Sequence, residues 1–192
     1  PPRPLSSAAS DVYKRQALRS GLRALRDIGV EGVMLDVWWG IVERHGPRKY
    51  DWEAYREVMD EIKAADLKVQ AVMSFHACGA NVGDVVEIPL PDWVLEAGEK
   101  DPDLFFTDQY GYRNPECISL WADNASTLAG RTPMNTYKDF MISFRNTFKA
   151  ELGTTLTEVA VGCGPCGELR YPAYPENKFA QRASQWTFPG IG

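Results

Sequence analysis

The sequence has few histidines and cysteines, no long apolar segment and no excess of positive charge. Two histidines and four cysteines do not form a zinc cluster, and the cysteines lack the spacing of a secreted disulfide scaffold. No apolar run reaches membrane-spanning length, and no signal-peptide pattern is visible. A net charge of -5 offers no basic surface for phosphate backbones. We therefore expect a protein of a reducing intracellular compartment, cytoplasm or plastid, with no metal, no cofactor, and neither nucleic acid nor a membrane as partner.

The composition is that of one globular domain. The chain has 192 residues, of which 44% are hydrophobic and 24% charged, which allows a substantial core. Residues 1–16 are rich in proline, serine and alanine and show no hydrophobic period, so we expect them to be unstructured and of non-family or artefactual origin. Residues 17–192 then form part of a single domain.

Segments of helical periodicity alternate with short apolar runs. This pattern predicts crossover helices between parallel strands, and hence an α/β fold. The expected helices begin near Leu18, at Asp51 as a cap, around Trp93, and at Thr132–Pro133. The expected strands are 33–39, 67–75 and 158–161. Residues 101–124 form a long irregular loop, which in a compact domain is often functional.

Each expected strand is followed by a polar side chain. Asp36 lies near the end of the first strand, His76 and Asp84 follow the second, and Glu168 follows the third. Ligands and chemistry collect at the carboxyl ends of parallel strands, as in a (β/α) barrel. Glu168 is thus a candidate general acid. The alternative is that Glu168 and Arg170 belong to a structural salt-bridge network.

Several acids, an imidazole and many aromatic rings suit a carbohydrate ligand. Carboxylates accept hydrogen bonds from sugar hydroxyls, and flat rings cover the C–H faces of sugars. The aromatic residues close to the polar ones in sequence are Trp38, Trp39, Trp93, Tyr171 and Tyr174, although each could equally pack a barrel rim. Glycosidic cleavage commonly needs two carboxyl groups. Glu168 can be the first, and no second acid is clearly placed.

Two long stretches carry a family resemblance. The stretch 76–84, H-A-C-G-A-N-V-G-D, resembles the first signature of the β-amylases, and 164–174, G-P-C-G-E-L-R-Y-P-A-Y, resembles their second. The stretch 36–40, D-V-W-W-G, is also similar. Three positions depart from the family pattern: Ala80 stands for a glycine, Cys166 for serine or alanine, and Ala173 for serine.

The resemblance implies an inverting, exo-acting hydrolase that releases maltose from the non-reducing ends of starch-type α-1,4-glucans. Glu168 would donate the proton, and Asp36, His76 and Asp84 would bind glucose hydroxyls. In the family the general base is a glutamate further along the chain than Gly192. The chain would then hold about three of the eight strands of a TIM-type barrel, strands 2–4, and we expect it to be inactive alone.

Three other functions stay open on the sequence alone. Cys163-Gly164-Pro165-Cys166 matches a thioredoxin-type redox motif, but Gly167 and Pro172 do not suit the helix that such a motif opens. The protein could be a catalytically silent, glucan-binding or regulatory relative of the β-amylases. A barrel glycosidase for a β-linked sugar is disfavoured by the stretch 76–84.

Overall fold

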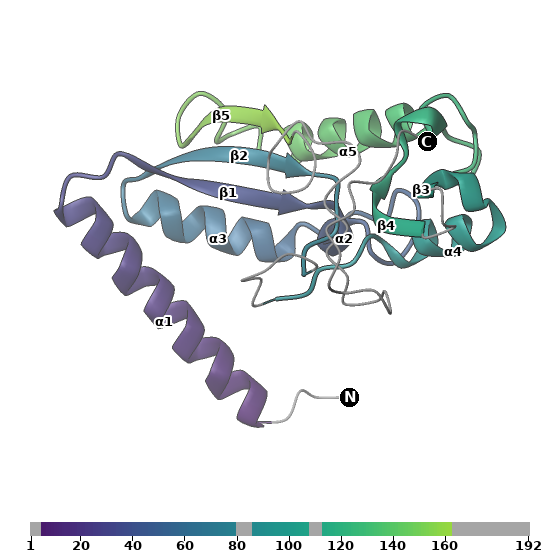
Figure 1. Cartoon of the computed structure of the whole chain (residues 1–192). Coiled ribbons are helices and arrows are strands. Elements are labelled where there is room, and N and C mark those ends of the chain that lie inside the picture. The colour runs from purple at the N-terminus through teal and green to yellow at the C-terminus, as the bar shows by residue number, and fades with distance from the viewer. Residues whose placement is uncertain (1–4, 80–85, 108–112, 163–192) are drawn as a thin grey trace, which may run out of the picture. The chain divides into compact units, whose positions relative to one another are not determined.

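The computed structural model describes residues 5–79, 86–107 and 113–162 (Figure 1). It divides into two compact units: unit 1 is Pro1–Leu35, Trp52–Ala71 and Phe148–Val159, and unit 2 is Asp36–Asp51, Val72–Thr147 and Ala160–Gly192. The elements in chain order are α1 (Leu5–Asp27), β1 (Gly32–Trp38), α2 (Trp39–Val42), α3 (Glu53–Ala64), β2 (Lys68–Ser74), α4 (Asp92–Lys100), η1 (Pro102–Leu104), β3 (Phe105–Thr107), β4 (Arg113–Ile118), η2 (Leu120–Ala122), α5 (Pro133–Thr147) and β5 (Leu156–Val161). None of the helices in these ranges combines the length and apolarity needed to cross a bilayer.

Three strands form a parallel sheet in the order β1-β2-β5. The N–H of Val69 donates to the carbonyl of Thr155 at 2.8 Å, and the N–H of Gly162 donates to Met73 at 2.9 Å. Because the partners advance together along both strands, β2 and β5 run in the same direction. Figure 1 shows all three arrows pointing the same way. The predicted alternation of helices and parallel strands is confirmed, and the described strands form an open partial sheet.

Helices α1 and α3 of unit 1 are joined by ion pairs. Arg19 contacts Glu61 at 2.6 Å, and Arg15 contacts Glu57 at 2.7 Å. The expectation that residues 1–16 are unstructured is wrong for residues 5–16, since α1 begins at Leu5. Residues 5–16 contain no glycine or proline and several good helix formers, so the helix that was expected near Leu18 extends backwards.

Helix α3 packs the apolar face that the sequence predicts. Tyr55, Met59 and Ile62 are buried, as expected from their helical spacing. Its start differs from the prediction: α3 begins at Glu53, and Trp52 rather than Asp51 is the N-cap residue. The ring of Trp52 is 6% exposed and packs on Phe148 with the ring centroids 5.7 Å apart, so burial of the indole fixes the helix start.

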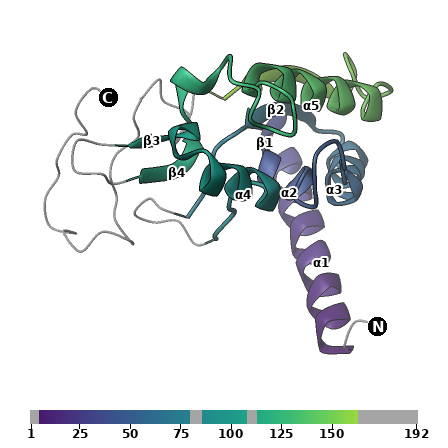
Figure 2. The same ribbon diagram turned by 90° about the vertical axis from the view of Figure 1, so that its right-hand side faces the viewer.

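In unit 2, the segment expected to be a long irregular loop contains regular structure. Strands β3 and β4 pair antiparallel, with Phe105 opposite Ile118, and α4 lies beside them (Figure 2). Phe105, Phe106 and Ile118 are buried, because the aromatic and β-branched residues in this stretch can cover one face of a small sheet. The prediction of an irregular segment at 101–124 is therefore wrong for residues 102–107 and 113–122, where the structure describes short helical turns and strands.

Helix α5 begins at Pro133, and its N-terminus is capped by Thr132, whose Oγ1 accepts from the N–H of Asn135 at 3.1 Å. Phe140 and Phe144 are buried, and the ring of Phe140 lies 5.4 Å from that of Phe75. The predicted start of the helix and its apolar face are confirmed.

Strand β5 is longer and less covered than the sequence predicts. It begins at Leu156, and Val159 and Val161 are 44% and 57% exposed. The prediction of a buried strand at 158–161 is thus wrong for the described residues. Val159 and Val161 are two residues apart and so lie on one face of β5, and this face is exposed in the described part of the chain.

Two helical glycines give a matched test of packing. A Cβ on Gly40 would lie 1.8 Å from the backbone carbonyl oxygen of Pro89, whereas a Cβ on Gly21 would meet nothing within 4 Å. We expect Gly21→Ala to raise the free energy of unfolding by about 0.5–1 kcal/mol through helix propensity. Gly40→Ala should lower it by about 1–3 kcal/mol through overpacking. Urea unfolding of both variants measures these changes, and a Gly40→Ala chain as stable as its parent would contradict the packing.

Candidate active site

Asp36 and Ser74 meet at the carboxyl ends of β1 and β2. The Ser74 hydroxyl donates to Asp36 Oδ1 at 3.4 Å. Ser74 is 1% exposed, and the Asp36 carboxylate is half-buried. Neighbouring parallel strands place their last residues at one sheet edge, and this contact holds the Asp36 side chain there.

His76 lies against Trp38. The centroids of the two rings are 5.1 Å apart at an interplanar angle of 69°, which is an edge-to-face contact. Asp36 and Trp38 are two residues apart on β1, so their side chains point to the same face of the strand. Two of the predicted site residues, Asp36 and His76, therefore lie at the same end of the sheet, with Trp38 linking them.

Backbone hydrogen bonds fix the chain on either side of the segment that contains Asp84. The N–H of Ala77 donates to the carbonyl of Glu116 at 2.6 Å, and Cys78 and Ile88 exchange two hydrogen bonds of 2.9 Å. Asp84 itself lies outside the described residues. The described ends of its segment meet at Cys78, two positions after His76.

Gly162, the residue directly after β5, lies against the backbone of β2. A Cβ at this position would lie 2.6 Å from the carbonyl oxygen of Met73, so only glycine allows the close approach of the two backbones. Glu168, the candidate acid, lies outside the described residues, as do its alternative partner Arg170 and the Cys163–Cys166 motif. The structure describes the chain only up to the strand end that precedes them.

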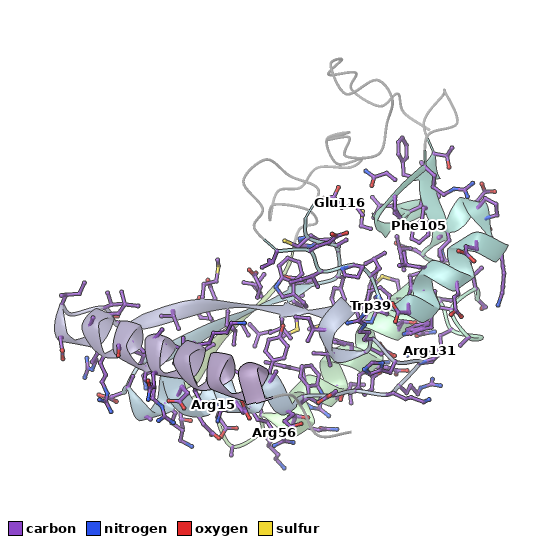
Figure 3. All side chains as sticks on the ribbon, turned by 90° about the horizontal axis from the view of Figure 1, so that it is seen from below. Arg15, Trp39, Arg56, Phe105, Glu116 and Arg131 are labelled. Atoms are coloured by element: carbon purple, nitrogen blue, oxygen red, sulfur yellow. The ribbon has the colours of Figure 1, made fainter. Side chains whose placement is uncertain are left out.

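The structure also contains a buried acid that the sequence analysis did not identify. Glu43 is 0% exposed. Its carboxylate accepts from Trp39 Nε1 at 2.7 Å, from the N–H of Arg48 at 2.6 Å and from Arg131 Nη2 at 3.1 Å, and its carbonyl accepts from Trp93 Nε1 at 2.8 Å. In the sequence, the four-residue spacing of Trp39 and Glu43 was a signal that the two side chains meet on one face of a helical turn. Figure 3 labels Trp39 and Arg131, the two residues whose side chains donate hydrogen bonds to this carboxylate.

Arg131 is the centre of a buried network of charges. It is 5% exposed, its Nη1 contacts Asp139 at 3.1 Å, and its guanidinium lies 5.6 Å from the Trp93 ring centroid. Burial acts to lower the pKa of Arg131, but the hydrogen bond and charge of Glu43, with hydrogen bonds to Asp139 and Tyr50, outweigh it and raise the pKa above its usual value. Arg131 thus remains charged, and each buried charge has an opposite partner.

Burial affects one of the two described thiols. Cys78 and Cys117 are free. Burial, with the charge of Glu116 beside it, raises the pKa of Cys117 to about 12. Burial likewise raises the pKa of the Tyr137 hydroxyl. Both groups are neutral near pH 7, so Cys117 acts as a packing residue rather than a nucleophile. Within the described ranges, no three His, Cys, Asp or Glu side chains gather into a set that could hold a metal ion.

The fold and the site describe an α/β protein that presents a carboxylate, an imidazole and an aromatic ring at the ends of parallel strands. The sequence profile of glycosyl hydrolase family 14 matches residues 4–192. The chain therefore belongs to this family.

Its relatives are β-amylases. The chain is 54% identical to "Beta-amylase 1, chloroplastic" of Arabidopsis thaliana, over 98% of its own length and 32% of the relative's. It is 53% identical to "Beta-amylase 1, chloroplastic" of Oryza sativa subsp. japonica, over 98% of this chain and 34% of the relative. The crystal structure of the catalytic domain of the Paenibacillus polymyxa β-amylase superposes with a TM-score of 0.72 at 34% identity, covering 92% of this chain and 38% of that one. The chain spans about a third of the length of the curated relatives it matches.

The raised pKa of Cys117 predicts an inert thiol. At pH 8 its thiolate fraction is roughly a thousandfold below that of an ordinary cysteine. We expect iodoacetamide to label Cys117 very slowly in the folded protein and readily in urea, as measured by peptide mass spectrometry. Equal labelling rates in the two conditions would show that the thiol is exposed.

Proposed function

We propose that the protein carrying this chain is a β-amylase, an inverting glycosidase that hydrolyses the α-1,4-glucosidic bonds of starch-type glucans from their non-reducing ends and releases maltose. The observation that carries the proposal is the arrangement of Asp36, Trp38 and His76 at one end of a parallel sheet in a chain of glycosyl hydrolase family 14. Two relatives named as β-amylases, each more than half identical to the chain, support it.

The described residues suit the recognition of a sugar. A carboxylate such as Asp36 accepts hydrogen bonds from two vicinal hydroxyls, and the imidazole of His76 can donate or accept. The half-buried ring of Trp38 offers an apolar surface beside both groups. We assign Asp36, His76 and Asp84 to glucose binding next to the scissile bond.

In the proposed reaction Glu168 is the general acid. Its protonated carboxyl gives a proton to the glycosidic oxygen as that bond breaks, while water attacks the anomeric carbon from the opposite face. A second carboxylate removes a proton from this water, and the two carboxyls stand roughly 6.5–9.5 Å apart to admit it. The product has the inverted, β-anomeric configuration. This acid–base chemistry is complete with two carboxyls and water.

We also propose a plastid location for the protein. The support is that both plant relatives carry the word chloroplastic in their names. A fluorescent fusion of the complete reading frame tests the location directly.

The role of Glu168 is tested in the longest protein that carries this sequence. Glu168→Gln keeps the shape of the side chain but cannot donate a proton, so we expect the rate of maltose release from soluble starch to fall by about 10²–10⁴-fold. The matched control is Glu158→Gln, since Glu158 is exposed on β5 and hydrogen-bonded to Gln70. It should keep the parent rate.

The outcomes separate the two functions considered. Undiminished maltose release by Glu168→Gln would contradict its role as the acid. A parent protein that binds maltose but releases none from starch would instead be a glucan-binding member of the family. The anomeric form of the first maltose released, read by proton NMR, tests inversion independently.

Asp36 gives a second prediction. Asp36→Asn leaves the Ser74 contact possible but weakens charge-assisted bonds to sugar hydroxyls, which contribute about 1.5–3 kcal/mol. We expect KM for maltooligosaccharides to rise by roughly 10–100-fold. Steady-state kinetics measure the change in KM, and an unchanged kcat/KM would show that Asp36 does not bind the substrate.

A further inference from the structure

The buried carboxylate of Glu43 closes the turn that follows the site strand. Helix α2 is only four residues long and begins directly after Trp38, whose φ and ψ are −77° and 120°. The N–H of Glu43 donates to the carbonyl of Trp39 at 3.0 Å, and its carboxylate accepts from the indole N–H of the same residue at 2.7 Å. Both the backbone and the ring of Trp39 are thus held by Glu43, which constrains the backbone of Trp38 next to it.

Two adjacent ring pairs connect this turn with the end of β2. Trp38 packs on His76 at 5.1 Å, and Trp39 packs on Phe75 at 6.1 Å. The residues of the second pair are the chain neighbours of the first. The Trp38–His76 pair is half-buried, whereas Trp39 is 0% exposed. Each residue of the inner pair is joined through the backbone to one residue of the outer pair, which holds the proposed sugar-contacting groups.

The inner pair belongs to a larger ring cluster that Glu43 also anchors. Trp39 packs edge-to-face on Trp93 at 5.9 Å and on Tyr137 at 5.4 Å. Trp93 in turn donates its indole N–H to the carbonyl of Glu43 at 2.8 Å. Ring packing alone tolerates sliding and tilting, but hydrogen bonds from two indoles to one residue fix the angle of each ring.

The stability of the fold does not by itself explain why a charged residue occupies position 43. A buried ion pair is often no more stabilising than apolar side chains of similar volume. The Glu43 carboxylate accepts directional hydrogen bonds from three donors, and these bonds restrict the orientation of the donor groups. Arg131 forms an ion pair with that carboxylate at 3.1 Å and is itself paired with Asp139, which Arg48 Nε also contacts at 3.1 Å.

We propose that Glu43 is a positioning residue for sugar binding: through Trp39 it fixes the Trp38–His76 pair, and Arg131 and Asp139 hold Glu43 in place. Glu43 acts through other side chains and does not touch the substrate. The choice of a glucose-based ligand rests on the proposed function, whereas the coupling from Glu43 to Trp38 and His76 does not.

The experiment uses Glu43→Gln in the longest protein that carries this sequence, labelled with nitrogen-15 in tryptophan and histidine. The amide has one acceptor oxygen, so at least one of the three donors loses its partner. We expect the indole signal of Trp39 to move, and the signals of Trp38 and His76 to move with it. Titration with maltose should show binding weakened at least about tenfold, since small displacements in a site have large effects. All spectra are recorded well below the melting temperature of each variant.

Asp139→Asn is the second variant, because loss of Glu43 can prevent folding. Asp139 is the outer member of the network and its side chain is 32% exposed, so the change is milder. We expect shifts of the same signals in the same direction but smaller. The matched control is Asp92→Asn, which breaks the exposed Arg44–Asp92 pair of 3.6 Å and should leave Trp38, His76 and maltose binding unchanged.

The results distinguish the inference from the proposed function. Unmoved Trp38 and His76 signals in Glu43→Gln, or in Asp139→Asn where the first variant does not fold, overturn the inference whether or not maltose binds. Moved signals with unchanged maltose affinity also overturn it, since positioning would then not matter for binding. Moved signals in a protein whose parent does not bind maltose overturn the proposed function and leave the coupling supported.

Discussion

Parallel pairing of β1 and β2 is the constraint on which the site depends. Parallel strands end at the same edge, so a residue near the end of one strand lies beside a residue near the end of the next. Asp36 and Trp38 come from β1, and Ser74 and His76 come from the end of β2. No loop has to fold back to bring them together. The arrangement follows from strand direction and the two-residue period of the pleat.

Two kinds of contact support the site, namely the packing of aromatic rings and the hydrogen bonds of buried charged groups. Rings such as Trp39, Phe75 and Phe140 exclude water and fill volume. Glu43 and Arg131 add directed bonds inside that apolar cluster. In such surroundings a carboxylate without partners is strongly unfavourable, and the Glu43 carboxylate accepts from three donors. The hydrogen bonds of Glu43 with Trp93 and Arg131 link α2, α4 and the segment before α5 within unit 2.

Much of this organisation could be predicted from the sequence because the relevant signals are local. Helical spacing identified the buried face of α3, the Thr132–Pro133 pair identified the start of α5, and the apolar runs placed Asp36 and His76 at the ends of neighbouring strands. The features that the sequence did not predict depend on tertiary contacts. Glu43 looks like an ordinary surface acid until Arg131, distant in the sequence, is placed against it.

Other misses have the same origin. The pairing of β3 with β4 comes from contacts between short segments with weak individual propensities, and the packing of Trp52 on Phe148 decides where α3 begins. Helix α1 extends to Leu5 although the first residues lack an apolar period, since its residues have good intrinsic propensity and Arg15 finds Glu57 on α3. In the first two cases a tertiary partner decides the local structure, whereas α1 extends mainly through its intrinsic helix propensity.

The valines of β5 have a consequence for handling the protein. Val159 and Val161 are solvent-accessible on a strand at the margin of the sheet as the structure describes it. A strand at the margin of a sheet that also exposes apolar side chains is a surface onto which another extended chain can add. Concentrated solutions of this polypeptide are therefore prone to self-association along β5, and a lysine introduced at position 159 or 161 would be the natural means of keeping it dispersed.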